Sequence, residues 1–206
     1  MIEAETQLRD VFGHAEGLAV QKARPALDKY SRQLMSLSPF LVISTANAQG
    51  KADVSPRGDP PGFVHAIDDK TILIPDRPGN NRLDTMVNIV ENPNVACLFF
   101  IPGFEDTLRV AGKARITTDA ALLSHCTVQG KAPKASIVVA IDEVFLHCAK
   151  ALKRSKLWQD DYRQDRSQMP SIARIILDQT CDSGIDEALA VKKDHDVEEA
   201  YREKLY

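Results

Sequence analysis

Short segments rich in β-branched and aromatic residues follow one another along most of the chain, and this succession limits the possible folds more than any other feature. The segments are FLVISTAN, KADVSP, FVHAI, TILIP, NVACLFFI, TLRVAGKARITT, SIVVAI and VFLHC. Turn sequences such as NAQG, DD and PGFED separate them, as is typical of hairpins. About seven strands with few helices between them predict an antiparallel barrel rather than an alternating parallel sheet. The predicted fold class is therefore mainly β with flanking helices.

Helical patterns flank the strands. Before Ser38-Pro39, the apolar residues at three- and four-residue steps are Leu27, Tyr30, Leu34 and Leu37. This spacing predicts an N-terminal helix over about residues 24–37. Two further helices are predicted over about residues 171–206, where a mixed run of charges is typical of a solvated helix surface. No repeat or linker divides the chain, so we expect a single domain, residues 1–206, with the barrel at about 38–158.

Two short helices are predicted between strands. In NNRLDTMVNIVEN, residues 80–92, the residues at helical spacing are Leu83, Met86, Val87 and Val90. Either Asn80 or Asn81 could serve as the N-cap of this helix, and Asn92-Pro93 would end it. The second short helix is expected near DAALLSHC.

Composition excludes several functional classes. The chain has 206 residues, of which 44% are hydrophobic, and a formal net charge of −3, so no basic field would gather nucleic acid. No run approaches the roughly 18 apolar residues of a membrane span, and the beginning of the sequence lacks a signal-peptide pattern. The four cysteines form no CxxC pair, which predicts reduced thiols in a cytoplasmic protein. Neither GxSxG nor HExxH occurs, and the histidines have no ligand spacing, so no metal site is expected.

The stretch SPRGDPPGF, residues 55–63, predicts a stiff loop at the end of a strand. Its three prolines cannot donate backbone hydrogen bonds and restrict φ, so the backbone that carries Arg57 is rigid. A rigid backbone suits an arginine that must form a bidentate contact with a phosphate or carboxylate. The simpler interpretation is a turn that carries charges for solubility.

Two more polar segments combine residues suited to an anion. PDRPGNNRLD supplies Arg77 and Arg82, together with a glycine and two asparagines at the predicted helix start, where free N–H groups favour negative charge. In DTLRVAG, Thr107 and Arg109 lie two residues apart and so on one face of a strand. If the barrel brings these segments to Arg57, three or four arginines surround one small cavity.

The alternative pairs each arginine with an aspartate close to it in the sequence. The pairs would be Arg57 with Asp59, Arg77 with Asp76, and Arg82 with Asp84.

The quoted segments resemble the pyridoxamine 5′-phosphate oxidase-like family of FMN-binding split barrels. The resemblance spans roughly residues 38–158, and its most specific pieces are SPRGD, the NNRLD segment, ENPNVACLFF and LRVAGKA. It implies an antiparallel barrel of about six strands that forms a homodimer and binds FMN at the dimer interface. Within the family, the chain is most similar to a bacterial branch of flavoproteins that also share its FLHCAKALKRSKLW segment.

The resemblance also implies site residues. Ser55 and Arg57, with Asn81 and Arg82, fall on the positions that hold the FMN phosphate, and Thr107 falls where the oxidases commonly place a glutamine against the flavin ring. The RSxLW-like ending implies that Arg154, Ser155 and Trp158 reach the flavin of the partner subunit; the alternative for Trp158 is a packing anchor. The candidate cofactor-binding residues are Ser55, Arg57, Arg77, Asn81, Arg82, Thr107, Arg109, Arg154, Ser155 and Trp158.

The implied activity is that of an FMN-dependent oxidoreductase. A reduced small molecule or nicotinamide would donate hydride to the flavin, which would pass electrons to oxygen or another acceptor, so no catalytic side chain is assigned. The substrate-binding stretch near the C-terminus of true pyridoxamine phosphate oxidases is missing, which argues against oxidation of vitamin B6 itself. The alternatives are a flavin carrier or sensor without turnover, and a relative that binds haem or the deazaflavin F420.

Overall fold

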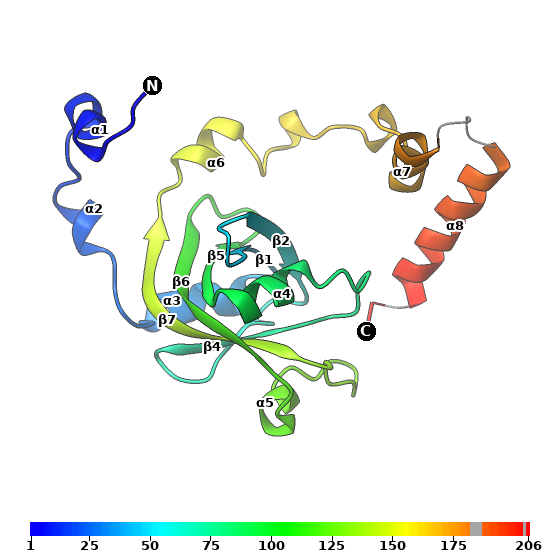
Figure 1. Ribbon diagram of the computed structural model, residues 1–206, viewed down its shortest axis with the longest axis horizontal. Coiled ribbons are helices and arrows are strands. Elements are labelled where there is room, and N and C mark those ends of the chain that lie inside the picture. The colour runs from blue at the N-terminus through cyan, green and yellow to red at the C-terminus, as the bar shows by residue number, and fades with distance from the viewer. Residues whose placement is uncertain (182–186, 204) are drawn as a thin grey trace.

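A seven-stranded antiparallel sheet forms the centre of the protein (Figure 1). The computed structural model describes residues 1–181, 187–203 and 205–206. The strands are β1 (Phe40–Ala46), β2 (Ala52–Gly58), β3 (His65–Ala66), β4 (Thr71–Pro75), β5 (Asn94–Phe100), β6 (Thr107–Thr117) and β7 (Ser136–His147). Their order across the sheet is β2-β1-β5-β6-β7-β4-β3. The sheet curls without closing, so the prediction of a mainly β, split-barrel-like fold with flanking helices is confirmed.

The last two predicted strands, SIVVAI and VFLHC, are one continuous strand, β7. Asp142 and Glu143 separate these two segments in the sequence, but the ladder with β6 continues past them. The register shifts there, from Ala111 opposite Glu143 to Gly112 opposite Ile141, which is the pattern of a β-bulge. Beyond the bulge, β7 pairs with β6 on one side and β4 on the other, and it therefore links the two halves of the sheet.

The concave face of the sheet carries the core. Directly paired residues point to the same face, so the register places Leu41, Phe99 and Leu108 side by side, all with no measurable exposure. Cys97 lies in the same layer and is 1% exposed, so it is a core residue. Its neighbours Ala96 and Leu98 point to the outer face.

The N-terminal helix begins later than the apolar spacing predicted. Helix α3 (Lys29–Leu37) starts after Asp28, whose Oδ1 accepts a hydrogen bond from Ser31 N at 2.8 Å. The predicted first turn, residues 24–28, is not helical, because Arg24 exchanges two backbone hydrogen bonds with Val144 of β7. Helices α1 (Glu5–Phe12) and α2 (Leu18–Gln21) precede it and bury no residue.

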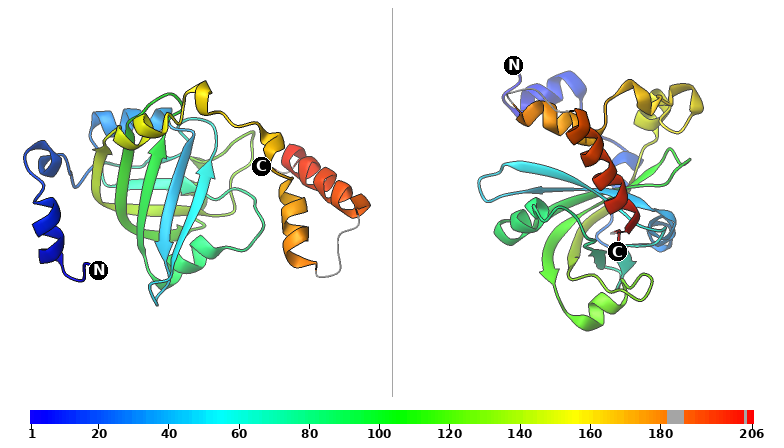
Figure 2. Two further views of the ribbon diagram at one scale, coloured as in Figure 1. Left: turned by 90° about the horizontal axis from the view of Figure 1, so that it is seen from above. Right: turned by 90° about the vertical axis from the view of Figure 1, so that its right-hand side faces the viewer.

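The remaining helices lie between and after the strands. They are α4 (Asp84–Glu91), α5 (Ala120–Ser124), α6 (Lys150–Ser155), α7 (Ile172–Thr180) and α8 (Glu187–Glu203), with 3₁₀ turns at Asp160–Tyr162 and Arg166–Gln168. The prediction that Asn80 or Asn81 caps α4 is wrong, because the helix begins only after Leu83. Figure 2 shows α1 and the α7–α8 pair on opposite sides of the barrel. Within the described residues, no helix has the length and apolar character needed to cross a membrane.

Candidate functional site

Two loops meet where the sheet fails to close. One follows β2, the edge strand at one end of the sheet order, and the other follows β4, near the opposite end. Arg57 Nη1 donates to Asp76 Oδ1 at 2.7 Å, and Arg77 Nε donates to Asp59 Oδ2 at 2.5 Å. These crossed ion pairs join the end of β2 and the loop after it to the loop after β4, across the split of the barrel.

The crossing differs from both interpretations of the sequence. Arginines are paired with aspartates, as the simpler alternative held, but Arg57 and Arg77 have exchanged the partners expected for them. Only Arg82 keeps its predicted partner, with Nε 2.8 Å from Asp84 Oδ2. The crossing is what brings SPRGD and PDRPG together, because each arginine reaches into the other loop.

Burial makes the two pairs unlike surface ion pairs. The exposed fractions of the side chains are 17% and 24% for Arg57 and Asp76, and 15% and 1% for Arg77 and Asp59. A nearly buried carboxylate needs compensating partners, since desolvation strongly disfavours its charge. The stiff Asp59-Pro60-Pro61 segment therefore positions a buried acid as well as Arg57.

The guanidinium of Arg57 has N–H groups that donate to no acceptor in the part of the chain that the structure describes. Among the described residues it makes a single hydrogen bond, from Nη1, and its Nε is buried with no partner. A buried guanidinium N–H without an acceptor is costly, so this arginine suits an additional anionic oxygen. The FMN phosphate implied by the resemblance fits this requirement. Arg57 also lies close enough to Cys97 to lower that thiol's pKa slightly, but burial prevails and raises it to about 12.

The loop between β4 and α4 has an unusual backbone. Asn81 and Leu83 both have φ of 58°, a left-handed conformation that non-glycine residues rarely adopt. Asn80 Oδ1 accepts a hydrogen bond from Arg82 N at 3.1 Å, which helps to hold the loop. The Arg82 side chain projects outward and is 73% exposed. Strained backbone of this kind is often retained at binding sites.

Arg109 does not join the cluster. Arg57 pairs with Leu41, Leu41 with Phe99, and Phe99 with Leu108, so all four side chains lie on one face of the sheet. Arg109 follows Leu108 in the strand and therefore points to the opposite face. There its guanidinium lies 5.5 Å from the ring centroid of Phe145. The expectation of three or four arginines around one cavity is therefore wrong for a single chain. Arg57 and Arg77 are together, whereas Arg82 and Arg109 lie apart from them.

A separate groove of about 450 Å³ lies between the loop before β6 and the end of α6. Trp158 forms one wall, and its Nε1 donates to Phe104 O at 2.7 Å. The wall is tied down by an ion pair between Lys153 Nζ and Glu105 Oε2 at 2.9 Å. Trp158 is 38% exposed, so one edge of its ring anchors the loop while another stays open to the groove.

The other predicted residues near this groove differ in exposure. Thr107 begins β6 directly after Asp106 of the groove wall and is only 2% exposed. Ser155 Oγ donates to Leu152 O at 3.1 Å within α6. Arg154 is exposed and has no polar partner among the described residues. The structure thus gathers Thr107 and Trp158 at one end of the barrel, and Ser55 and Arg57 on β2.

Sequence reasoning missed two features of the arginine cluster. Tyr206 Oη donates to Asp59 Oδ1 at 2.6 Å, although 147 positions separate the two residues. His65 and His125 lie with ring centroids 6.4 Å apart on the same side as Arg77. The pKa of His65 is lowered, first by burial and then by the charges of His125 and Arg77. No local pattern signals either contact, because each joins segments distant in sequence.

A family model for pyridoxamine 5′-phosphate oxidase matches residues 27–148, which is more than half of the chain. The chain belongs to this family. The match covers all seven strands and both loops of the crossed ion pairs. No curated protein matches the sequence.

Several solved structures are similar to this chain. Group A Streptococcus HupZ has 19% identity and a TM-score of 0.49, covering 58% of this chain and 93% of its own. A putative pyridoxamine 5′-phosphate oxidase from Lactobacillus delbrueckii has 19% identity and a TM-score of 0.48, covering 59% and 95%. An FMN-binding protein from Syntrophomonas wolfei has 12% identity and a TM-score of 0.43, covering 70% and 97%.

Proposed function

We propose that this protein binds FMN at the split of the barrel and acts as an FMN-dependent oxidoreductase. The observation that carries the proposal is the state of Arg57: nearly buried, held by Asp76, and with Nε unsatisfied. A phosphate oxygen would supply the missing acceptor. Membership of the pyridoxamine 5′-phosphate oxidase family supports the choice of a flavin phosphate over other anions.

The phosphate contacts would come from two adjacent segments. Ser55 and Arg57 share the inner face of β2, because they lie two residues apart in one strand. Asn81 and Arg82 belong to the neighbouring loop, whose exposed Arg82 side chain could turn toward an anion by giving up Asp84. Arg77 would add positive charge beside them. Rigid donors of this kind bind a phosphate without a large loss of conformational entropy.

The flavin ring would lie toward Thr107 at the start of β6, whereas Arg109, which points to the other side of the sheet from Arg57, would not help to hold the phosphate. When bound, FMN supplies the hydride and electron chemistry. The protein's own residues would bind the phosphate, orient the ring and exclude water. A reduced small molecule or a nicotinamide would be the donor, and no side chain is required as a nucleophile.

A homodimer would complete the site, with Arg154, Ser155 and Trp158 contributed to the flavin of the partner subunit. The outer face of the neighbouring strands β2, β1 and β5 supports this arrangement. Val54 is 64% exposed there, and Phe40, 38% exposed, packs against Phe100 in a tilted arrangement with 6.1 Å between the ring centroids. Adjacent exposed apolar residues on a sheet favour an interface over contact with water.

The first test compares FMN affinity in the native protein, Arg57→Ala and Arg57→Lys. Each charge-assisted hydrogen bond contributes roughly 1.5–3 kcal/mol, so Arg57→Ala is expected to weaken FMN about ten- to hundredfold, and Arg57→Lys less. Arg115→Ala, an exposed arginine on β6 outside the proposed site, is the control. Thermal melting of each variant separates lost binding from lost folding. Unchanged affinity in Arg57→Ala would remove Arg57 from the site.

A second measurement separates an enzyme from a carrier. The absorbance spectrum of the FMN-loaded protein is recorded before and after anaerobic addition of NADH or NADPH. Bleaching supports the oxidoreductase. A flavin that stays oxidised favours the carrier or sensor alternative, or another donor. A protein that cannot be loaded with FMN contradicts the cofactor assignment and leaves haem or F420 to be tried.

A further inference from the structure

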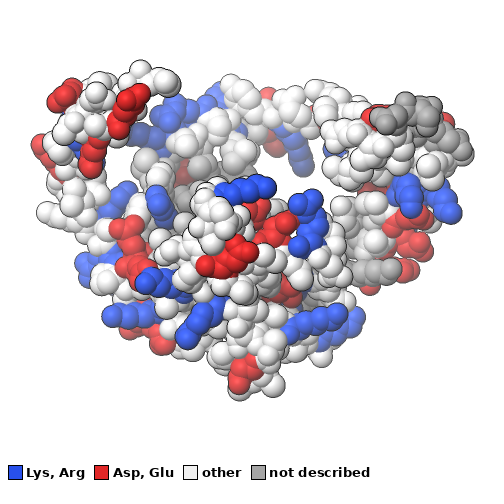
Figure 3. All heavy atoms as spheres, in the orientation of Figure 1, with Lys and Arg blue, Asp and Glu red and all other residues white. Residues whose placement is uncertain are grey.

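The C-terminal arm, by which we mean α7, α8 and residues 205–206, is attached to the barrel in an unusual way. Its two helices pack on each other, and the strands of the barrel make no extensive contact with either of them. Several of its apolar side chains stay exposed, among them Ile172, Ile176 and Val191. Figure 3 shows acidic and basic residues interspersed over the face on which this arm lies, with no continuous patch of one sign. Among the described residues, broad packing of α7 and α8 against the strands therefore does not fix the arm.

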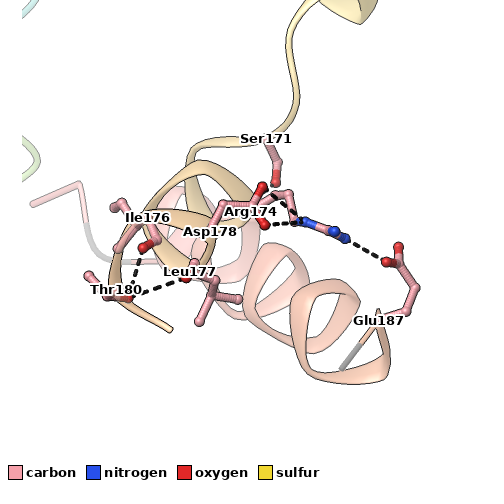
Figure 4. Close-up of polar contacts among 7 residues, drawn as sticks. All are labelled: Ser171, Arg174, Ile176, Leu177, Asp178, Thr180 and Glu187. Atoms are coloured by element: carbon pink, nitrogen blue, oxygen red, sulfur yellow. Dashed lines mark hydrogen bonds and ion pairs between the residues drawn. The ribbon is translucent and has the colours of Figure 1, made fainter. Parts of the chain in front are cut away.

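The described residues of the arm have their own internal ties. Arg174 on α7 bonds Asp178 one turn later at 3.2 Å and Glu187 on α8 at 2.5 Å, as Figure 4 shows. The two helices also pack on each other, and each has one buried residue, Ala173 on α7 and Ala190 on α8. These contacts make α7 and α8 behave as one body, so a contact at its far end restrains the position of both helices.

That far-end contact is Tyr206. Its Oη donates to Asp59 Oδ1 at 2.6 Å, its ring lies 5.5 Å from the guanidinium of Arg77, and its carbonyl oxygen accepts a hydrogen bond from Lys131 Nζ at 3.2 Å. Three elements of the barrel side therefore hold one tyrosine. Figure 1 shows the C-terminus beside the loop that joins β4 to α4.

Tyr206 contacts the crossed ion pairs themselves. One oxygen of the Asp59 carboxylate accepts from Arg77 and the other from Tyr206, so the buried acid is shared between the loop and the arm. Arg77 is further fixed by Nη2, which donates to Cys126 O at 2.9 Å. With Tyr206 in place, the side chains of Asp59 and Arg77 are 1% and 15% exposed.

We propose that the C-terminal arm is a strap over the arginine cluster and that Tyr206 is its latch. In the latched state, Tyr206 positions Asp59 against Arg77 and limits access to that guanidinium. The Tyr206 ring lies over the Arg77 guanidinium, so an anion can approach that guanidinium more easily once the strap is released. This step rests on the proposed anion site, whereas the latch itself is a property of the chain without any ligand.

Coupling between the latch and the anion is reciprocal. If an open strap favours binding at Arg77, binding must by the same factor favour an open strap. The phenol donates to a carboxylate, so its hydrogen bond shifts the latch equilibrium by roughly ten- to hundredfold. Both directions of this coupling can be measured.

The test is amide hydrogen exchange of residues 187–203 in FMN-free protein. Tyr206→Phe keeps the ring over Arg77 and removes only the hydroxyl, while Tyr206→Ala removes both contacts. We expect roughly tenfold faster exchange in Tyr206→Phe and at least as much in Tyr206→Ala. The control is Tyr201→Phe, which changes an exposed tyrosine of α8 and should leave the exchange of residues 187–203 unchanged. Equal exchange in all four proteins would overturn the latch.

FMN at saturating concentration is then the probe of coupling. Exchange of residues 187–203 should rise when FMN is added to the native protein, and rise less in Tyr206→Phe, whose strap is already open. FMN should also associate faster with Tyr206→Phe than with Tyr201→Phe. Binding of FMN without any change in the exchange of the arm contradicts the strap. If FMN does not bind, the proposed function fails, and the exchange measured without FMN still decides the latch.

Discussion

Replacing Gly112 with alanine should damage the fold more than any other glycine-to-alanine change near the core. Gly112 lies at the β-bulge between β6 and β7, within the LRVAGKA segment that is specific to the family resemblance. A Cβ built there would stand 2.1 Å from Ala140 O and 2.9 Å from Ala140 C. Ordinary van der Waals contact begins at 3.4 Å, so the methyl group is about 1.3 Å too close to the backbone of β7.

The obstacle is backbone rather than a side chain that could change rotamer. β7 cannot retreat from β6 without also disturbing its ladder with β4, because residues 136–140 pair on both sides. Overpacking of this severity costs about 3 kcal/mol. For a chain of this size, that corresponds to a fall in Tm of roughly 6–12 °C.

Thermal unfolding followed by circular dichroism checks this value. Gly79→Ala is the matched control, since nothing lies within 4 Å of its Cβ position and its φ is not in the left-handed region. The control should be neutral or slightly stabilising, by about 0.4–1 kcal/mol at most. A Gly112→Ala protein that melts within about 1 °C of the native one would refute the close-approach argument.

Two further predictions concern titratable groups. The four thiols differ in exposure: Cys148 and Cys181 are exposed, and Cys97 and Cys126 are buried. A thiol reagent such as Ellman's should therefore label two thiols quickly in the folded protein and all four after denaturation, and rapid labelling of four under native conditions would contradict the packing. The pKa of His65 is lowered, mainly by burial, so between that pKa and the ordinary value of 6.5 the unfolded chain binds a proton that the folded chain does not. The stability that neutral His65 contributes is thus complete above pH 6.5 and is lost as the pH falls through the lowered pKa. Between pH 7.5 and 5.5, the Tm of His65→Gln should therefore fall less than that of the native protein. Equal falls in Tm in the two proteins would contradict this.

The sequence was sufficient for the strands because their patterns are local. It failed at β7, which was predicted as two strands, because a bulge lets the ladder continue past two exposed acids. It also failed at the start of α3, because pairing of Arg24 with Val144 keeps the predicted first turn out of the helix. Both errors arise where a long-range backbone ladder overrides local propensity.

The candidate site was predictable in its residues but not in its pairing. SPRGD and PDRPG were predicted to share one site if the barrel brought them together, and the structure does bring them together. Arg77 cannot readily bond Asp76, since consecutive side chains in extended backbone point to opposite sides, and the crossed partner is supplied by the other loop. Tyr206 could not be found from sequence, because its contact with Asp59 depends on the whole arm lying beside the barrel.

The crossed ion pairs have a mechanical consequence for the barrel. Neighbouring strands of the sheet are joined by backbone hydrogen bonds, which break cooperatively. Between β2 and the loop after β4, the contact consists instead of two ion pairs, each between a carboxylate and a guanidinium group. Side-chain bridges can open independently of each other, and dissolved ions weaken them where water enters. The barrel can therefore open locally between β2 and β4 while every strand keeps its hydrogen bonds to its neighbours. An incoming phosphate would exchange one set of ionic partners for another and leave the sheet itself undisturbed.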